Sequence, residues 1–240
     1  LYLFAGNRDA ASAQIRQGLT EKAQNYASKV DSLLNQASSV AVTTAQFLSV
    51  NDNMSESAMY DVLRRNVGGN RLIYGAAIAF EPGVFDGRKL FSPYAFREGA
   101  DIKAIDIGVS AYDYTQPQWE WYALPKKQNQ ALWTEPYFDE GAGNINMVTF
   151  SVPFRRNGQV GGVTTVDLDL GRLLGLAGIA EEDRKTLLIV SPGGRVAYSP
   201  NAKDITRPVS DVKLGFNSGS GKPLLADSRP GDIVEATTDT

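Results

Sequence analysis

The chain has 240 residues, with 24 Lys and Arg against 27 Asp and Glu, so its formal net charge is −3. This balance, with no run of basic residues, argues against a nucleic-acid-binding protein. The chain has no Cys and no His, which excludes thiol nucleophiles, Ser-His-Asp triads and zinc sites built on thiolate or imidazole.

The first 50 residues predict one long helix. Leu1-Tyr2-Leu3-Phe4 is an abrupt apolar start, and we expect it to be the outer end of a transmembrane helix, although no stretch reaches the ~18 apolar residues of a full span. From about Asp9 to Phe47, apolar residues recur every three or four positions, which is typical of a helix with one buried stripe. We expect this helix to be continuous and to pack on both of the modules that follow it. The stripe comprises Ile15, Leu19, Ala23, Tyr26, Val30, Leu33, Ala37, Val40, Thr44 and Phe47.

The next part of the chain predicts a shorter helix and then strands. Ser55 is a suitable N-cap for a helix that runs through Val67 and ends at Gly68-Gly69-Asn70. Residues 73–80 are apolar and predict a strand, and residues 90–96 predict the returning strand, with Pro93 suggesting an edge or a bulge. Residues 101–117 show no clear period, so we expect a loop with short elements.

The centre of the chain interleaves rings with carboxylates. The runs Trp119-Glu120-Trp121-Tyr122 and Trp133-Thr134-Glu135-Pro136-Tyr137-Phe138-Asp139-Glu140-Gly141 contain all three tryptophans. Two strands are predicted after them, at residues 146–154 and 161–170, joined by a hairpin turn at residues 155–158. Aromatic walls with a few fixed polar groups are typical of a small-molecule pocket.

A second, shorter strand-turn-strand cycle is predicted after a helix at residues 168–176. It has a strand at 186–190, a turn at 192–194 and a strand at 195–198, and its closing strands are not evident before Thr240. We therefore expect three parts: a helix over 1–50, a ligand-binding module over 51–176, and a smaller module over 177–240. The second module has no Trp, which favours the first module as the pocket.

Three other patterns carry weaker signals. Gly219-Ser-Gly-Lys222 lacks the first Gly and the final Ser or Thr of a phosphate loop, which favours a plain loop. Residues 139–146 carry oxygen ligands but no closing Glu, so a glycine-fixed turn is favoured over a calcium site, and we expect no metal and no cofactor. Paired carboxylates of a hydrolase stay an alternative, drawn from Asp139, Glu140, Asp167 and Asp169.

Four motifs of the chain resemble those of the double Cache family. They are W-x-W-Y at 119–122, W-T-E-P-Y-x-D at 133–139, M-x-T-x-S-V-P-F at 147–154 and G-x-V-T-x-D-L-x-L at the last long strand. These tandem PAS-like domains are extracytoplasmic sensors of bacterial chemoreceptors, sensor kinases, cyclases and phosphatases. The resemblance implies an α+β fold, with a long N-terminal helix alongside two PAS-like modules that have antiparallel sheets.

The resemblance also implies a ligand site. In the amino-acid-sensing members, an R-x-W-Y element supplies an Arg for the ligand carboxylate; here Trp121 and Tyr122 match, and Trp119 replaces the Arg. Tyr137 and Asp139 match a Y-x-D element in which the Asp holds a ligand ammonium group. Asp167 matches a further Asp, and Tyr94 is expected to add another ring. Arg97 or Lys89 is a further candidate source of positive charge.

We therefore expect the extracytoplasmic ligand-binding domain of a membrane-anchored bacterial signalling receptor, homodimeric in the full-length protein, without catalytic residues. Because Trp cannot bind a carboxylate through two parallel hydrogen bonds, an amine or a neutral polar metabolite is favoured over a free amino acid. An extracytoplasmic hydrolase, and a dimerisation or adhesion module without a ligand, remain the alternatives.

Overall fold

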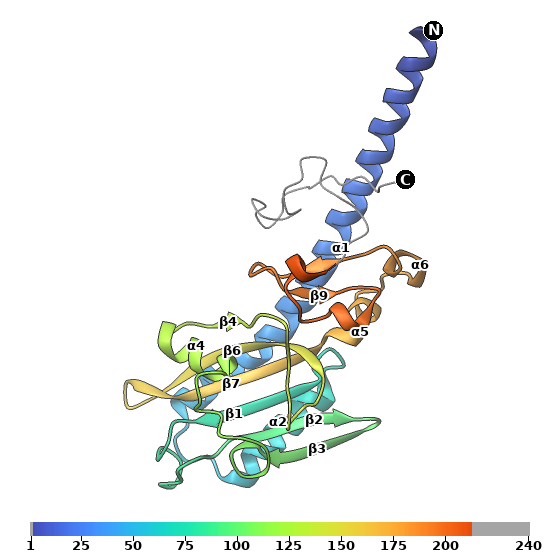
Figure 1. Ribbon diagram of the computed structural model, residues 1–240. Helices are drawn as coiled ribbons and strands as arrows, with labels where there is room; N and C mark the ends of the chain where they lie inside the picture. The colour runs from blue at the N-terminus through green and yellow to red at the C-terminus, as the bar shows by residue number, and fades with distance from the viewer. Residues whose placement is uncertain (1, 213–240) are drawn as a thin grey trace.

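The computed structural model describes residues 2–212, with side chains from residue 13 onward. It has the expected α+β architecture: a long helix, a large antiparallel sheet and a small two-stranded sheet (Figure 1). The Gly219–Lys222 loop and any closing strands of the second module lie outside the described residues. No helix in the described part of the chain is long and apolar enough to cross a membrane.

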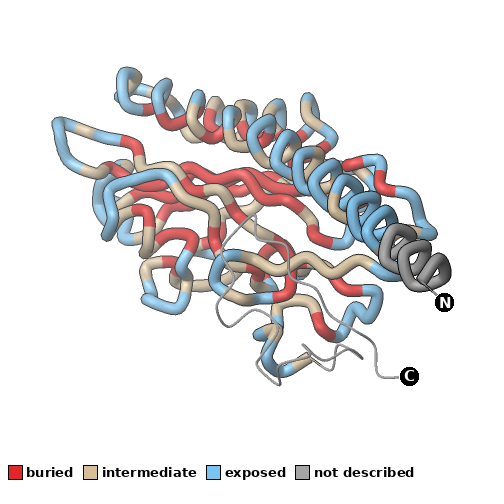
Figure 2. The backbone as a smooth tube through the Cα atoms, turned by 90° about the horizontal axis from the view of Figure 1, so that it is seen from above, coloured by how far each residue is buried: buried red, intermediate tan, exposed pale blue. Residues whose placement is uncertain are grey.

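Helix α1 (Tyr2–Val50) is a single helix of 49 residues, as the apolar spacing predicts. Its C-terminal half lies across the large sheet, and its N-terminal half projects beyond the sheet (Figures 1 and 2). Alanines form the contacting stripe, so the helix approaches the sheet closely, and Thr164 on the sheet donates a hydrogen bond of 3.0 Å to the Ala41 carbonyl. The predicted stripe is wrong at both ends: Ile15, Leu19 and Phe47 are 64%, 63% and 43% exposed, and Leu48 is buried in place of Phe47.

The large sheet has the strand order β3-β2-β1-β7-β6-β4, with β5 also paired to β6. The strands are β1 (Gly75–Phe80), β2 (Pro93–Glu98), β3 (Asp101–Asp106), β4 (Leu132–Trp133), β5 (Tyr137–Phe138), β6 (Asn146–Arg156) and β7 (Gln159–Asp169). Strands β6 and β7 form the predicted hairpin, whose turn residues Asn157 and Gly158 have φ of 51° and 79°. Positive φ at both central residues is the type I′ geometry that suits the twist of a hairpin.

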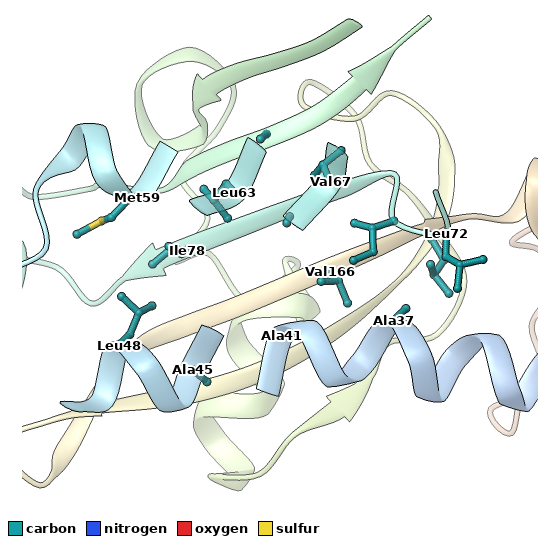
Figure 3. Packing of buried hydrophobic residues seen from close by; sticks show 14 of the residues in the cluster. Ala37, Ala41, Ala45, Leu48, Met59, Leu63, Val67, Leu72, Ile78 and Val166 are labelled. Atoms are coloured by element: carbon teal, nitrogen blue, oxygen red, sulfur yellow. The ribbon is translucent and has the colours of Figure 1, made fainter. Parts of the chain in front are cut away.

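One face of the sheet is covered by α1 and by α2 (Glu56–Gly69). Ser55 caps α2 as expected, accepting a hydrogen bond from Ala58 N. Met59, Leu63 and Val67 of α2 pack with Ala37, Ala41, Ala45 and Leu48 of α1 over the same sheet face (Figure 3). The loops and short helices of residues 107–145 cover the opposite face of the sheet.

That second face carries α3 (Ile107–Ser110) and α4 (Glu120–Gln128), which packs against β6 and β7. After β7 follow α5 (Leu170–Leu176) and α6 (Glu181–Arg184), then the small sheet of β8 (Ile189–Val190) and β9 (Val196–Tyr198). Two 3₁₀ turns, η1 (Ala202–Asp204) and η2 (Val209–Asp211), close the described chain. The small sheet also packs on α1, through Tyr26, Val30 and Leu33, so α1 contacts both sheets as expected.

Three local expectations were wrong. Strand β2 is internal rather than an edge, and Pro93 is tolerated because it is the first residue of the strand, where no ladder donor is needed. Residues 101–106 form strand β3, hidden in the sequence because an edge strand keeps its charged residues exposed. The helix expected from Leu168 begins only at Leu170, because Asp169 ends the strand and caps α5 through Gly171 N at 2.8 Å.

Candidate functional site

The site is built on the sheet face opposite α1. Side chains alternate between faces along a strand, so the register decides which of them meet. Asp167 on β7 lies between Gly75 of β1 and Thr149 of β6. In the next row, Thr165 lies opposite Ala77, and Ala77 lies opposite Tyr94 of β2. Large polar side chains therefore flank a strand whose residues on this face are small.

The glycine at position 75 is required by this arrangement. A Cβ there would lie 2.3 Å from the Tyr94 hydroxyl and 2.7 Å from Oδ2 of Asp167. Both atoms therefore occupy the space directly above Gly75, side by side. The Tyr94 hydroxyl is completely buried and makes no well-aligned hydrogen bond within the described part of the chain.

Asp139 reaches the same place from a tight turn. Its Oδ2 accepts a hydrogen bond of 2.7 Å from Gly143 N, and its backbone carbonyl accepts one of 2.8 Å from Asn144 N. Asn144 Oδ1 in turn accepts from Gly141 N at 3.0 Å. This is the glycine-fixed turn that the sequence favoured, with its oxygens used internally. Among the described residues, no group of three or more acidic side chains is placed to hold a metal ion.

The two carboxylates line one cavity. Its walls come from β1, β2, β7, α3, α4 and the segment around β5, and its lining residues are Ala77, Tyr94, Ile107, Tyr112, Trp121, Tyr137, Asp139, Thr165 and Asp167. The cavity has a volume of about 10 Å³, roughly that needed for a single water molecule. A molecule larger than water therefore does not fit the cavity unless one of its walls moves.

Burial dominates the electrostatics of the site. Asp139 and Asp167 are each 4% exposed, and no described ion pair involves either of them. Burial, with a further contribution from Asp139, raises the pKa of Asp167 to about 7, against the opposing hydrogen bond from Thr149. Burial also raises the pKa of Asp139, opposed by the donors Gly143 and Tyr112. The cavity thus holds two acidic groups and no cationic lining residue.

The aromatic hydroxyls around the carboxylates stay protonated. Burial raises the pKa of Tyr94 and of Tyr137 well above the ordinary tyrosine value. Tyr137 shares a 2.8 Å hydrogen bond with Thr149 Oγ1, which also donates to Asp167 Oδ1 at 2.8 Å. The Tyr112 hydroxyl donates to Asp139 Oδ1 at 2.7 Å. Apart from the two carboxylates, the polar groups around the cavity are therefore neutral.

The structure brings together five of the seven residues that the sequence placed at a ligand site: Tyr94, Trp121, Tyr137, Asp139 and Asp167. Trp119 lies just outside the cavity, stacked on Tyr112 with ring centroids 3.6 Å apart. Tyr122 is not on the cavity, because its side chain packs in the core against Tyr114 and donates to Glu81 Oε1 at 2.6 Å.

The suggested cations lie elsewhere. Arg97 donates to the carbonyls of Val67, Asn70 and Ile73 at the end of α2, and Lys89 is exposed and does not line the cavity. Of the other two carboxylates considered, Asp169 caps α5 and Glu140 is exposed. Only Asp139 and Asp167 of the four therefore meet at the cavity.

Sequence reasoning missed Tyr112, Thr149 and Thr165. The strand pattern could have indicated both threonines. Thr165 lies two residues before Asp167 on β7, so the two side chains share a face. Thr149 pairs with Asp167 across β6 and β7. Tyr112 carried none, because it lies in a segment without periodicity and reaches Asp139 only through the fold.

A second, larger hollow of about 230 Å³ lies next to the cavity, and the two share Trp121 and Tyr137 as lining residues. Trp119, Glu135, Phe138 and Arg195 also line it. Glu135 accepts hydrogen bonds from Ser191 Oγ and, at 3.0 Å, from Gly193 N, both in the turn between β8 and β9. The segment that carries Asp139 is thereby tied to the small sheet.

Comparison with solved structures places this architecture in a family. The extracellular domain described as that of histidine kinase soHK1S-Z6 is 33% identical in sequence, with a TM-score of 0.75 over 82% of this chain and 75% of that one. Residues 59–174 match the family model described as "Methyl-accepting chemotaxis protein-like, first PDC sensor domain". The chain belongs to the double Cache, or PDC, family of sensor domains.

The ligand-binding domains of two chemoreceptors share the fold at lower identity. The ligand-binding domain of the Pseudomonas aeruginosa PAO1 amino acid chemoreceptor PctC, solved with GABA, has a TM-score of 0.59 at 19% identity, covering 82% of this chain and 88% of that one. That of the Campylobacter jejuni chemoreceptor Tlp3, solved with L-valine, has a TM-score of 0.56 at 14% identity, covering 82% and 74%. No protein with a curated description matches the chain.

Proposed function

We propose that this chain is the ligand-binding part of a membrane-anchored bacterial signalling receptor, and that it senses a small organic cation bound between Asp139 and Asp167. The observation that supports this most directly is the pair of buried carboxylates in one cavity without a cationic partner. An unpaired buried charge is costly, so a positively charged guest is stabilised there.

The cavity walls favour the same class of ligand. Trp121, Tyr94 and Tyr137 present ring surface, and aromatic faces attract cations. Trp119 stands where amino-acid-sensing relatives have an Arg, so no side chain at that position can donate two parallel hydrogen bonds to a ligand carboxylate. An amine is therefore favoured over a free amino acid.

A neutral polar ligand is the second candidate. With a pKa of about 7, Asp167 is protonated in a large fraction of molecules near neutral pH and can then donate a hydrogen bond. A small polyol or amide would accept it while donating to Asp139. This candidate predicts binding that strengthens as the pH falls, the opposite of the trend for an amine.

In this proposal, residues 51–176 form the membrane-distal ligand-binding module, residues 177–240 belong to the membrane-proximal module, and residues 1–50 form the helix that connects them to the membrane. Ligand binding shifts the population towards one arrangement of the sheets against α1. The helix then transmits a small displacement to the membrane. Flanking segments anchor the protein in the inner membrane, and two copies pair in the full-length receptor. The region itself does not catalyse a reaction.

The test is a thermal-shift screen with three sets of small molecules: alkylamines and diamines, polyols, and organic acids. Hits are then measured by isothermal titration with the wild type, Asp139→Ala and Glu140→Gln. Glu140 is the neighbouring exposed carboxylate and serves as the matched control. Removing one partner of a buried charge pair costs about 2–5 kcal/mol, so Asp139→Ala should lose at least ~30-fold in affinity.

Glu140→Gln should bind like the wild type, and so should Glu181→Ala in α6. A best ligand that is a plain carboxylate without a cationic group would contradict the proposal. So would an Asp139→Ala variant with near-native affinity for an amine.

A further inference from the structure

Each oxygen of the Asp139 carboxylate accepts one hydrogen bond. Gly143 N donates to Oδ2 and the Tyr112 hydroxyl donates to Oδ1, both at 2.7 Å. Tyr112 lines the cavity and Gly143 does not, so a ligand ammonium that approaches Asp139 from the cavity meets the Tyr112 hydroxyl. Which donor can leave is decided by how each is held.

Gly143 is held firmly. It lies inside the 139–144 turn, its carbonyl accepts a hydrogen bond of 2.8 Å from the Tyr74 hydroxyl, and the residue is buried. A Cβ at this position would meet Met147 at 2.6 Å and Asp139 Oδ2 at 3.1 Å, so the space beside its Cα is filled. The Gly143 donor is part of the frame of the site.

Tyr112 is held much less. It lies between α3 and α4, its backbone N–H bonds only to the nearby Ile107 carbonyl, and it is half-buried. Its ring stacks on Trp119, which is itself half-buried, at an interplanar angle of 14°. Neither residue belongs to a strand of the sheet or to the 139–144 turn.

The size of the cavity points to the same residue. With Tyr112 in place there is room for about one water molecule, so a larger guest enters only if a wall moves. Tyr112 lines the cavity and Trp119 lines the adjoining hollow of about 230 Å³. Displacing the stacked pair would join the two spaces at the point where they already share Trp121 and Tyr137.

We propose that the Tyr112 hydroxyl is a built-in competitor that occupies the ammonium position on Asp139, so that Tyr112 determines the affinity and the size of the ligand. The inference rests on the proposed function. A neutral hydroxyl is a weaker donor to a carboxylate than an ammonium group, so a cationic ligand displaces it while a neutral alcohol does not. Trp119 serves as the support against which the Tyr112 ring closes.

The decisive variant is Tyr112→Phe, which removes the competing hydroxyl and keeps the ring on Trp119. Tyr60→Phe, which removes the same atom from a partly buried tyrosine of α2 remote from the cavity, is the matched control. The probes are ethylammonium chloride and ethanol, its neutral near-isostere, titrated with NMR detection of the protein amides. A hydrogen bond to a charged group contributes about 1.5–3 kcal/mol, so ethylammonium should bind Tyr112→Phe at least tenfold more tightly than wild type.

Unchanged or weaker binding of ethylammonium by Tyr112→Phe would overturn the inference, because Tyr112 would then be a ligand contact or a bystander. Trp119→Leu provides a second measurement, since loss of the support should speed association at least several-fold in stopped-flow fluorescence. An association rate equal to that of wild type would also count against it.

The outcomes separate this inference from the proposed function. If wild type binds ethylammonium and Asp139→Ala does not, the proposed function stands, and Tyr112→Phe alone decides the competitor role. If neither wild type nor Tyr112→Phe binds the cation, both fail. Binding by Tyr112→Phe where wild type shows none would support both.

Discussion

Asp167→Asn should remove most of the pH dependence of stability between pH 5 and pH 7.5. The pKa of Asp167 is about 7 in the folded protein, against an ordinary value of 3.8 for an aspartate carboxyl, so the folded state binds the extra proton over this interval. Stability from this group is fully present below pH 3.8 and is lost as the pH rises through about 7. Integrated from pH 5 to pH 7.5, with 1.36 kcal/mol per pKa unit, the loss is about 2.5 kcal/mol.

The composition makes this measurement unusually clean, because the chain has no histidine that would titrate in the same interval. Urea unfolding, followed by tryptophan fluorescence at several pH values, gives the unfolding free energy for wild type, Asp167→Asn and Asp101→Asn. Asp101 is an exposed strand residue and should leave the wild-type slope unchanged.

The asparagine variant retains an oxygen that accepts from Thr149, so its fold should survive. Asp139, whose pKa is also raised, leaves a smaller residual slope of the same sign. Equal slopes in wild type and Asp167→Asn would refute the reasoning, because Asp167 would then have to be ionised and solvated in the folded protein.

Three further outcomes follow from the same geometry. Amine affinity, measured by isothermal titration, should rise at least severalfold from pH 5.5 to pH 8, because the ionised form of Asp167 attracts the cation; a fall would favour a neutral ligand. Gly75→Ala should destabilise the fold by about 1–3 kcal/mol in urea unfolding, since its Cβ would overlap the Tyr94 hydroxyl and Asp167, whereas Gly69→Ala, with open space, should be tolerated. Gly193→Ala should raise amide hydrogen exchange in β8 and β9 but not in β1, because its Cβ would lie 2.5 Å from Cδ of Glu135. Unchanged exchange in β8 and β9 would contradict the role of Glu135 in holding their turn.

The sequence was most informative where a pattern had one physical cause. The long helix followed from unbroken apolar spacing, and the β6–β7 hairpin from Asn157 and Gly158 between alternating strands. Strand β3 was missed because its exposed Asp101 and Lys103 give an edge strand no apolar signal. Helix α4 was missed because its Pro125 and clustered rings do not resemble a surface helix.

The site was predictable to the extent that motif spacing fixes which residues share a sheet face. Asp167 and Tyr94 belong to strands, and alternation places them together with Gly75 and Ala77. Tyr122 adjoins Trp121 in sequence, but neighbouring residues of a helix point in different directions, so only Trp121 lines the cavity. The Tyr112 contact depends on where a long loop returns, which no local pattern encodes.

The spacing of Glu135, Tyr137 and Asp139 gives the site its connection to the rest of the protein. In an extended segment, residues two apart point to the same side. Tyr137 and Asp139 line the cavity, and Glu135 holds the turn between β8 and β9. The extended segment from Glu135 to Asp139 therefore contacts both the carboxylate pair and the small sheet, which itself packs on α1 through Tyr26 and Val30. If a ligand displaces Asp139, we expect the shift to reach Glu135 along this segment and, through it, the turn between β8 and β9.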